Sequence, residues 1–362
     1  MTTIHDVAAY AGVSIATVSN VLNRKGNTAE KTTAKVLAAV RELNYIPNAL
    51  AKDLKANRSR TIGIIAEDVS AFMSGNIIDG ISAVCETHDY AVTLCNLRAE
   101  HYMNTQPGMT YEMLPSYLPF QKAVSTAIDS LLSARVGGLI YIGLYPRDVS
   151  GILPDLGIPV VYTYCFTQNS SDYCVNYDDC HGSSIAMEHL ISLGHTRIAL
   201  ISGVINSIPG HKRMKGYTES LMKHNLLFDP TYIITGDWGF PHGYRSCMQL
   251  LDLPEPPTAI FCMSDVLAFG ALTAAHERGI RIPEQLSVHG FDDLLTSQFY
   301  LPPLTTVSLP LAGLGKTSAD LLLCIISGDT PEARGILIPC TEIVRSSTGA
   351  PVSVPPAISG NT

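Results

Sequence analysis

The sequence predicts a small all-α helix-turn-helix headpiece followed by a larger α/β domain of two lobes, each a doubly wound parallel sheet. Residues 3–23 contain two short helical patterns separated by a glycine-containing turn, and after residue 60 short β-rich runs alternate with helical stretches. The first 60 residues carry nine Lys or Arg against four acids, whereas the whole chain has a net charge of −8. A basic head on an acidic body is expected when only the head meets phosphate groups.

The headpiece begins with two amphipathic helices. In the first, four apolar residues recur at helical spacing and share one face: Ile4, Val7, Ala8 and Ala11. Gly12 tolerates the positive φ of a tight turn, and Ser14 can cap the second helix. In that helix the inward positions are Val18, Val21 and Leu22. We therefore expect the second helix to enter the major groove of DNA, with Ile15, Ala16 and Asn20 facing base edges.

A third helix and a short basic run follow. Thr28 can cap the helix and Asn44 can end it in the left-handed conformation, while its apolar face is Val36, Leu37, Val40 and Leu43. The run Ala49–Lys55 is too short to form a stable helix alone, because isolated helices under about 12 residues are marginal. We expect it to fold only when two copies meet on DNA.

These segments together resemble the lac repressor/galactose repressor (LacI/GalR) family of bacterial transcription regulators. DVAAYAGVS, TVSNVLN, ELNYIPNALA and DLKANRSRTIGII match its headpiece and hinge in order and spacing, and EHLISLGHTRIALISG is typical of its effector domain, which is similar to periplasmic binding proteins. The resemblance implies a headpiece at 1–47, a hinge at 48–60, a two-lobed effector-binding and dimerisation domain at 61–345 and a disordered tail at 346–362. It also implies a homodimer that binds an operator in double-stranded DNA and a small-molecule effector, a carbohydrate or related metabolite.

The resemblance extends to the DNA contacts. Phosphate contacts are expected from Thr3, Ser14, Thr17, Ser19 and Asn23. In the hinge the expected contacts are Asn48, Ala51 and Leu54, and Leu54 falls where the family inserts a leucine into the minor groove to kink the duplex. The tail has no leucine heptad, so we expect a dimer and no tetramer-forming coiled coil.

Effector residues are expected beyond the carboxyl ends of the strands, where ligands bind in open α/β sheets. The predicted strands are Thr61–Ala66, Tyr90–Cys95, Gly138–Ile142, Val160–Thr163, Arg197–Ser202, Tyr232–Thr235, Ala259–Met263 and Leu286–His289. Their ends offer Phe72, Thr163, Ser207, Arg213, Trp238, Ser264 and Asp292. Four of these residues fall on positions that touch effector in members of the family: Arg213, Trp238, Ser264 and Asp292.

Simpler interpretations exist for several of these residues. Ser264 or Asp265 can serve only as a helix cap, Asp292 can start a helix, and Trp238 can belong to the core. Thr163 occupies a position that is often acidic in sugar-binding members, which weighs against carrying over a sugar specificity.

One segment departs from the family pattern. Between Asn96 and Arg135 the chain is about fifteen residues longer than expected, and the extra part, about 100–119, is rich in Tyr, Met and Pro. The simpler interpretation is a tolerated surface insertion; the alternative is a lid or partner-binding loop on the crevice side.

The remaining features favour a cytoplasmic regulator over other classes. Nine cysteines without a C-x-x-C pair suit buried thiols in a reducing compartment, and neither a secretion signal nor a membrane span is recognisable. The sequence Gly313–Thr317 is no phosphate loop, because Pro310 stands where the motif needs glycine. No cofactor, metal spacing or nucleophile elbow is present, so an enzyme is not expected. The stronger alternative is a stand-alone small-molecule binding protein.

Overall fold

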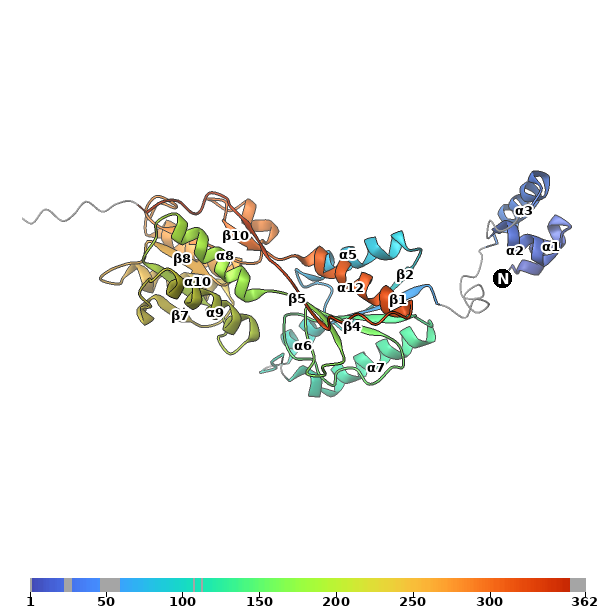
Figure 1. Cartoon of the computed structure of the whole chain (residues 1–362), viewed down its shortest axis with the longest axis horizontal. Coiled ribbons are helices and arrows are strands. Elements are labelled where there is room, and N and C mark those ends of the chain that lie inside the picture. Colours follow the sequence, from blue (N-terminus) through green and yellow to red (C-terminus); the bar gives the residue numbers. More distant parts are fainter. Residues whose placement is uncertain (1, 23–27, 46–58, 107, 112, 352–362) are drawn as a thin grey trace, which may run out of the picture. The chain divides into compact units, whose positions relative to one another are not determined.

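The computed structural model of this chain describes residues 2–22, 28–45, 59–106, 108–111 and 113–351. The chain divides into two compact units, Met1–Arg60 and Thr61–Thr362. Figure 1 shows the helices of the first unit and the two α/β lobes of the second. Within the described ranges, no helix combines the length and the apolar character needed to cross a membrane.

The described part of the first unit contains three helices: α1 (Ile4–Ala11), α2 (Ile15–Leu22) and α3 (Glu30–Glu42). Their small core contains the apolar residues expected to face inward on α1 and α2, and its buried members are Val7, Ala8, Ala11, Val18, Val21, Val36 and Ala39. The turn between α1 and α2 is confirmed, since Gly12 has a φ of 66° and ends α1 in the left-handed conformation.

Two details of α3 differ from the prediction. Thr28 does not cap it; the N-cap position is Ala29, which makes no side-chain capping bond. Leu37 was expected to face inward but is 43% exposed, because Val36 and Ala39 fill the helix contact instead. The left-handed end is confirmed at Asn44, which has a φ of 45°.

The first lobe of the second unit is built on a six-stranded parallel sheet with the order β11-β5-β4-β3-β1-β2. The strands are β1 (Thr61–Ala66), β2 (Ala91–Asn96), β3 (Gly138–Ile142), β4 (Val160–Thr163), β5 (Tyr173–Tyr177) and β11 (Gly335–Ile338). Helices α5 (Ser74–Thr87) and α12 (Leu311–Ile326) cover one face, and α7 (Leu118–Ser133) lies on the other (Figure 1). Short helices α6 (Ala99–Thr105) and η1 (Leu114–Ser116) lie between β2 and α7.

Close packing of α5 against α12 explains a glycine-rich sequence that superficially resembles a phosphate loop. A Cβ at Gly315 would lie 2.0 Å from the carbonyl oxygen of Ile77, and one at Gly80 would lie 2.2 Å from that of Ala312. Both glycines therefore allow the two helix backbones to touch. The sequence 313–317 lies within α12 and forms no loop.

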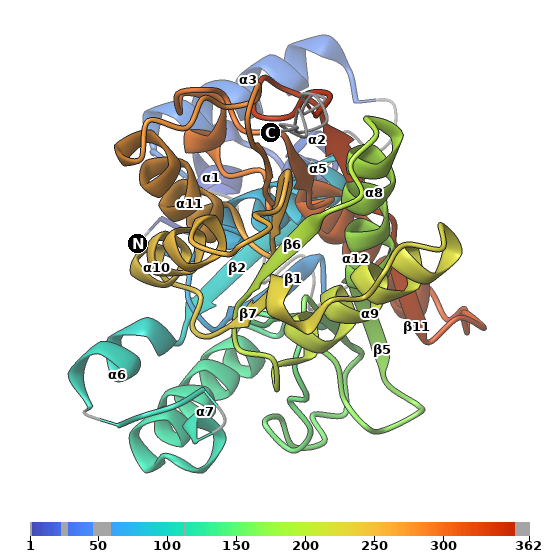
Figure 2. The same ribbon diagram turned by 90° about the vertical axis from the view of Figure 1, so that its left-hand side faces the viewer.

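The second lobe has a four-stranded parallel sheet with the order β7-β6-β8-β9. Its strands are β6 (Ile198–Ser202), β7 (Ile233–Thr235), β8 (Ala259–Cys262) and β9 (Ser287–His289). Helices α8 (Asp179–Ser192) and α9 (Ile208–Lys223) lie on one side of β6 and β7, and α10 (Phe240–Leu251) and α11 (Asp265–Glu277) lie on the other (Figure 2). The short helices η2 and η3 are Pro230–Tyr232 and Leu295–Gln298.

The chain passes between the lobes three times: from β5 to α8, from β10 (Thr306–Ser308) to α12, and from β11 to β12 (Thr341–Ile343). Strands β10 and β12 form an antiparallel pair. Packing continues past residue 345, since buried Ser347 pairs with Val288 and the carbonyl of Gly349 accepts from His195. The boundary expected at 345 is therefore too early; residues 352–362 lie outside the described part.

Candidate functional site

The exposed face of α2 is the candidate nucleic-acid interface. Ile15 is 40% exposed, and Ala16 and Asn20 are also exposed, while Val18 between them is fully buried. Ser14 fixes the start of the helix, because its Oγ accepts from the backbone N–H of Thr17 at 3.1 Å. The face thus offers two apolar groups and one amide side chain, which can both donate and accept hydrogen bonds.

The hydroxyls expected to meet phosphates are arranged around this face. Ser14 Oγ and Thr17 Oγ1 lie 2.9 Å apart at the N-terminus of α2, and Ser19 is half-buried. Thr3 is exposed but already occupied: its Oγ1 donates to Asp6 Oδ2 at 2.7 Å and caps α1. The expected contacts Asn23, Asn48, Ala51 and Leu54 lie outside the described residues.

Arg213 is the centre of the candidate effector site. It lies on α9, is 4% exposed, and contacts groups from both lobes. Its Nε donates to Asp179 Oδ1 at 2.8 Å and its Nη2 to the Tyr177 hydroxyl at 2.9 Å. Its Nη1 donates to the Met263 carbonyl oxygen and, at 3.4 Å, to Asp292 Oδ1. The structure therefore brings together the two residues predicted to converge, Arg213 and Asp292.

Asp292 has a positive φ and a raised pKa. Its φ of 116° is a conformation that L side chains rarely adopt, and the N–H bond to the Val307 carbonyl helps to hold it. It does not start a helix. Burial raises the pKa of Asp292 to about 8, against the opposing effect of the Arg213 guanidinium.

Aromatic rings surround the guanidinium. The Phe291 ring centroid lies 3.7 Å from Arg213 Cζ and the Trp238 centroid 5.7 Å away. Trp238 packs over Gly203, where a Cβ would come within 2.2 Å of the indole ring. Trp238 is half-buried, so it contacts the core as well as the guanidinium.

The other predicted effector residues are placed differently. Thr163 is fully buried and donates its hydroxyl to Ser318 Oγ at 2.6 Å, so it ties β4 to α12. Ser264 and Ser207 each cap a helix, accepting from Leu267 and Gly210. Phe72 is 47% exposed and does not contact the Arg213 cluster in the interactions found among the described residues.

Sequence reasoning missed Asp179 and Tyr177. Tyr177 is the last residue of β5 and Asp179 is the first residue of α8. Strand β5 was not predicted because its sequence, YCVNY, is short and contains Asn. The pair Asp178–Asp179 at its carboxyl end was the available signal. Asp178 caps α8 and accepts from His181, whereas Asp179 is fully buried and its Oδ2 has no hydrogen-bond partner.

The first lobe contributes a second buried ion pair at the carboxyl edge of its sheet. Fully buried Glu67 accepts from Arg147 Nη2, from the Tyr141 hydroxyl at 2.6 Å and from the Leu144 N–H at 2.9 Å. Asp68, which is 4% exposed, accepts from the backbone N–H of Glu100 at 2.9 Å.

The inserted segment is packed onto this edge. Leu114 is fully buried, and the Tyr111 hydroxyl donates to Glu100 Oε1 at 2.9 Å while its ring lies edge-on to Tyr145. Figure 1 shows α6 on the side of its lobe that faces the other lobe. The insertion is therefore an integral part of the first lobe and not only a surface loop, because it supplies core residues.

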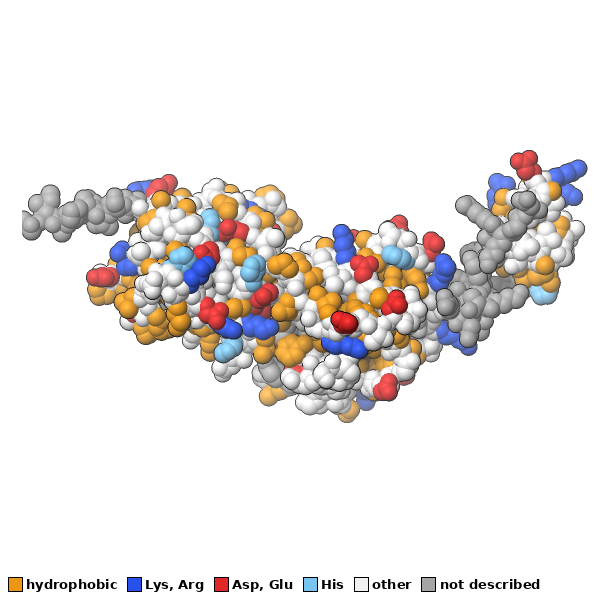
Figure 3. All heavy atoms as spheres, viewed as in Figure 1, with side chains coloured by type: hydrophobic (Ala, Val, Ile, Leu, Met, Phe, Trp, Pro, Cys, Tyr) orange, Lys and Arg blue, Asp and Glu red, His pale blue; other side chains and the backbone are white. Residues whose placement is uncertain are grey.

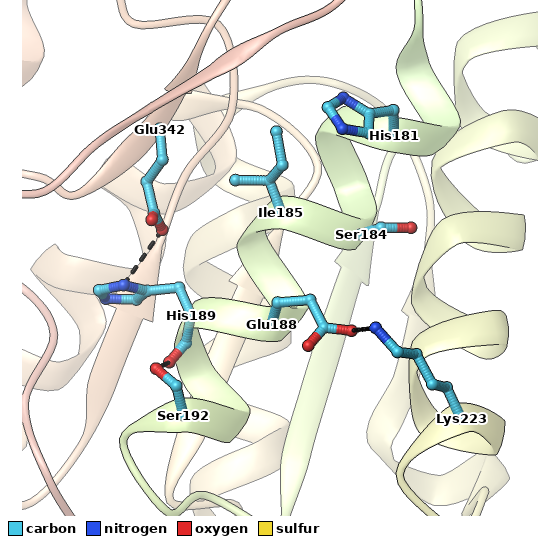
Figure 4. A pocket seen from close by; sticks show the side chains of 8 residues that line it. All are labelled: His181, Ser184, Ile185, Glu188, His189, Ser192, Lys223 and Glu342. Carbon is cyan, nitrogen blue, oxygen red and sulfur yellow. Dashed lines mark hydrogen bonds and ion pairs between the residues drawn. The ribbon is translucent and has the colours of Figure 1, made fainter.

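A separate cavity of about 510 Å³ runs along α8, away from the Arg213 cluster. Figure 4 shows Glu188 directed toward Lys223 of α9 and Glu342 of β12 directed toward His189. Glu342 Oε1 lies 3.2 Å from nitrogens of both His189 and His289. Burial by itself would raise the pKa of Glu342, but the bonds from these histidines outweigh it and lower the pKa to about 2. Within the described residues, no group of His, Cys, Asp and Glu is suited to hold a metal ion.

Comparisons with known proteins cover both units. The model for bacterial regulatory proteins of the lacI family matches residues 3–48, and the model for the periplasmic binding protein-like domain matches residues 187–348. The HTH-type transcriptional repressor CytR of Escherichia coli K12 is 34% identical over 349 residues, covering 96% of each chain. The repressor PurR of Photorhabdus laumondii is 34% identical over 351 residues, covering 96% of this chain and 97% of the relative.

Solved structures agree with these matches. A lac repressor dimer bound to operator and the anti-inducer ONPF aligns with a TM-score of 0.76 and 31% identity, covering 96% of this chain and 99% of that one. A complex of the regulator CelR with cellobiose aligns with a TM-score of 0.63 and 27% identity over 96% of this chain and 100% of that one.

Proposed function

The chain belongs to the lacI family of bacterial regulatory proteins, and we propose that it is a ligand-responsive repressor of transcription that binds a pseudo-palindromic operator as a homodimer in the cytoplasm. A small molecule held between the lobes controls its affinity for DNA. The proposal has a DNA-reading part and an effector-sensing part, which can be tested separately.

The observation that carries the DNA-reading part is the exposed face of α2. Asn20 is the hydrogen-bonding reader, and Ile15 and Ala16 offer apolar contact, for example with a thymine methyl group. Ser14, Thr17 and Ser19 hold phosphates near the start of the helix. Thr3 can do so only in addition to its cap, and Asn23, Asn48, Ala51 and Leu54 complete the proposed contacts from outside the described residues.

The charge distribution supports a division of labour between the two units. Residues 1–60 have five more basic than acidic side chains, whereas the chain as a whole is at −8. On the face of the lobes in Figure 3, acidic and basic side chains are interspersed. That face gives the phosphate backbone no continuous positive track, whereas residues 1–60 carry the net positive charge that suits it.

The effector-sensing part rests on the cluster around Arg213. Asp292 and Trp238 lie beside it, at the carboxyl ends of strands of the second lobe, and Tyr177 and Asp179 lie where the chain crosses between the lobes. The proposed site also includes four residues outside the interactions that the structure shows around Arg213: Ser264, Ser207, Thr163 and Phe72. Because a ligand here contacts groups at the crossovers, binding can favour one lobe orientation over another and change the spacing of the hinges.

The experiment is selection of binding sites from random duplex DNA by the full-length chain. We expect a pseudo-palindrome with half-sites one helical turn apart, bound by two chains in sedimentation. In the same assay, Leu54→Ala weakens binding with little change in salt dependence, because a wedging leucine neutralises no phosphate. Recovery of no common sequence, with binding that depends only on salt, would refute a sequence-specific regulator.

A further inference from the structure

The charge of the Arg213 cluster is set largely by one residue outside the expected effector set, Asp179. It is fully buried at the start of α8 and forms the shortest ion pair with Arg213, 2.8 Å from Nε. Arginine in a ligand site ordinarily suggests a carboxylate or phosphate ligand. Here the guanidinium already has a carboxylate partner that belongs to the protein.

The donors of Arg213 are also nearly exhausted. A guanidinium has five N–H groups. Four are directed at Asp179, Tyr177, Met263 and Asp292. The Phe291 ring lies 3.7 Å from Cζ and covers one face of the group. One N–H remains, whereas the bidentate binding of an oxyanion uses two.

The unsatisfied groups of the cluster are acceptors. Asp179 Oδ2 is buried and has no partner, and the Asp292 side chain keeps 12% of its surface exposed. Nearby Asp265 is fully buried but satisfied, because it accepts from Ser297 and Thr306. A ligand that completes this cluster must therefore supply hydrogen-bond donors.

The wider charge balance points the same way. The carboxyl ends of the strands carry five acids that are buried or nearly so, Glu67, Asp68, Asp179, Asp265 and Asp292, against two arginines, Arg147 and Arg213. Arg147 is paired with Glu67 and does not compensate the cluster of the second lobe. An anion bound at the Arg213 cluster would lie among acceptor groups, and the one cation that the described residues place in this cluster already has a carboxylate partner in Asp179. An uncompensated buried charge is costly.

We propose that Asp179 sets the charge class of the effector: by neutralising Arg213 it makes the cleft select an uncharged or cationic molecule rich in hydrogen-bond donors and reject phosphates and carboxylates. This inference rests on the proposed effector site between the lobes. Asp292 is the group left to meet the ligand, because its side chain is 12% exposed, whereas Asp179 is fully buried and is held by Arg213 as its counter-ion.

The test uses matched probes that differ only by a phosphate: the four ribonucleosides, ribose and glucose, each beside its monophosphate. Binding to the full-length chain is followed by the thermal unfolding midpoint and by the fluorescence of Trp238, the only tryptophan. We expect at least one uncharged probe to bind the parent, and its phosphorylated partner to bind at least 100-fold more weakly.

Asp179→Asn removes the charge and keeps the shape of the side chain. It should reduce the ratio of the affinity for the uncharged probe to that for its monophosphate at least tenfold. The control is Glu188→Gln on the same helix, whose carboxylate pairs with exposed Lys223 away from the cluster; its ratio should equal that of the parent. Tighter or equal binding of a phosphorylated probe by the parent overturns the proposal without any variant, and an unchanged ratio in folded Asp179→Asn overturns the role of Asp179. Binding of no uncharged probe overturns the ligand class, while operator binding by the same sample leaves the regulator function standing.

Discussion

The buried cluster around Arg213 predicts an asymmetric response to mutation. Arg213→Met removes the cation and leaves Asp179, which is fully buried, with no hydrogen-bond partner at either oxygen. The Tyr177 hydroxyl and the Met263 carbonyl lose their partner as well. Arg213 is therefore a structural residue in addition to its proposed role in effector binding.

The expected magnitude follows from this geometry. Breaking a buried ion pair by removing one partner costs about 3–5 kcal/mol, because the other charge remains uncompensated. Asp179→Asn should cost less, about 1–2 kcal/mol, because Arg213 keeps a second carboxyl partner in Asp292. The raised pKa of Asp292, about 8, would then fall as its carboxylate becomes the counter-ion. The double variant should recover at least half of the loss caused by Arg213→Met.

Equilibrium unfolding in urea, followed by Trp238 fluorescence, measures these differences, since the indole lies 5.7 Å from the guanidinium. Lys223→Met is the control: it removes a cation from the same helix, but one that is 67% exposed, and should change the free energy of unfolding by less than about 1 kcal/mol. The reasoning would be refuted if Arg213→Met lowered the free energy of unfolding by less than about 1 kcal/mol, or if Asp179→Asn lowered it by more than Arg213→Met does.

Three further predictions concern other parts of the chain. Asn20→Ala should lower operator affinity by about 1–3 kcal/mol and relax base preference in one half-site position, measured by fluorescence anisotropy; Asn104→Ala, exposed on α6, should do neither. Leu114→Ala should lower the free energy of unfolding by about 2–5 kcal/mol because its side chain is fully buried, whereas neighbouring Met113→Ala, 51% exposed, should change it by less than about 0.5 kcal/mol; equal effects would return the insertion to a surface role. The pKa of Glu342, about 2, lies below its unfolded value, so its ionisation stabilises the protein above about pH 4.5 and this contribution disappears as the pH falls toward 2. Glu342→Gln should therefore lose about 1–3 kcal/mol in urea unfolding at pH 7 and less at pH 3.5; a pH-independent difference would contradict the linkage.

The headpiece could be predicted almost entirely from sequence because its determinants are local. Helical spacing of apolar residues, Gly12 and Ser14 act within a few residues of each other, and the structure reproduces the turn, the cap and the buried faces of α1 and α2. The predictions at Thr28 and Leu37 were wrong because the start of α3 and its buried face depend on how α3 packs against the other helices. Ala29 is the N-cap, and Val36 and Ala39 are buried in place of Leu37. The predicted bounds of strands β1, β3 and β4 match the observed ones for the same reason, since each is a short run rich in apolar and β-branched residues.

The effector site divides differently. The sequence by itself determined that Arg213, Trp238 and Asp292 follow the carboxyl ends of strands along the chain. It also determined that the first 60 residues are basic whereas the whole chain is acidic. Only the tertiary structure decided that Asp179 pairs with Arg213, 34 residues away in the sequence, and that the Thr163 hydroxyl donates to Ser318, 155 residues away. It also decided that Leu114 of the insertion belongs to the core. These outcomes depend on which side chains are left unpaired once the lobes have packed, and a buried charge or hydroxyl takes the partner nearest in space, whatever its distance along the chain.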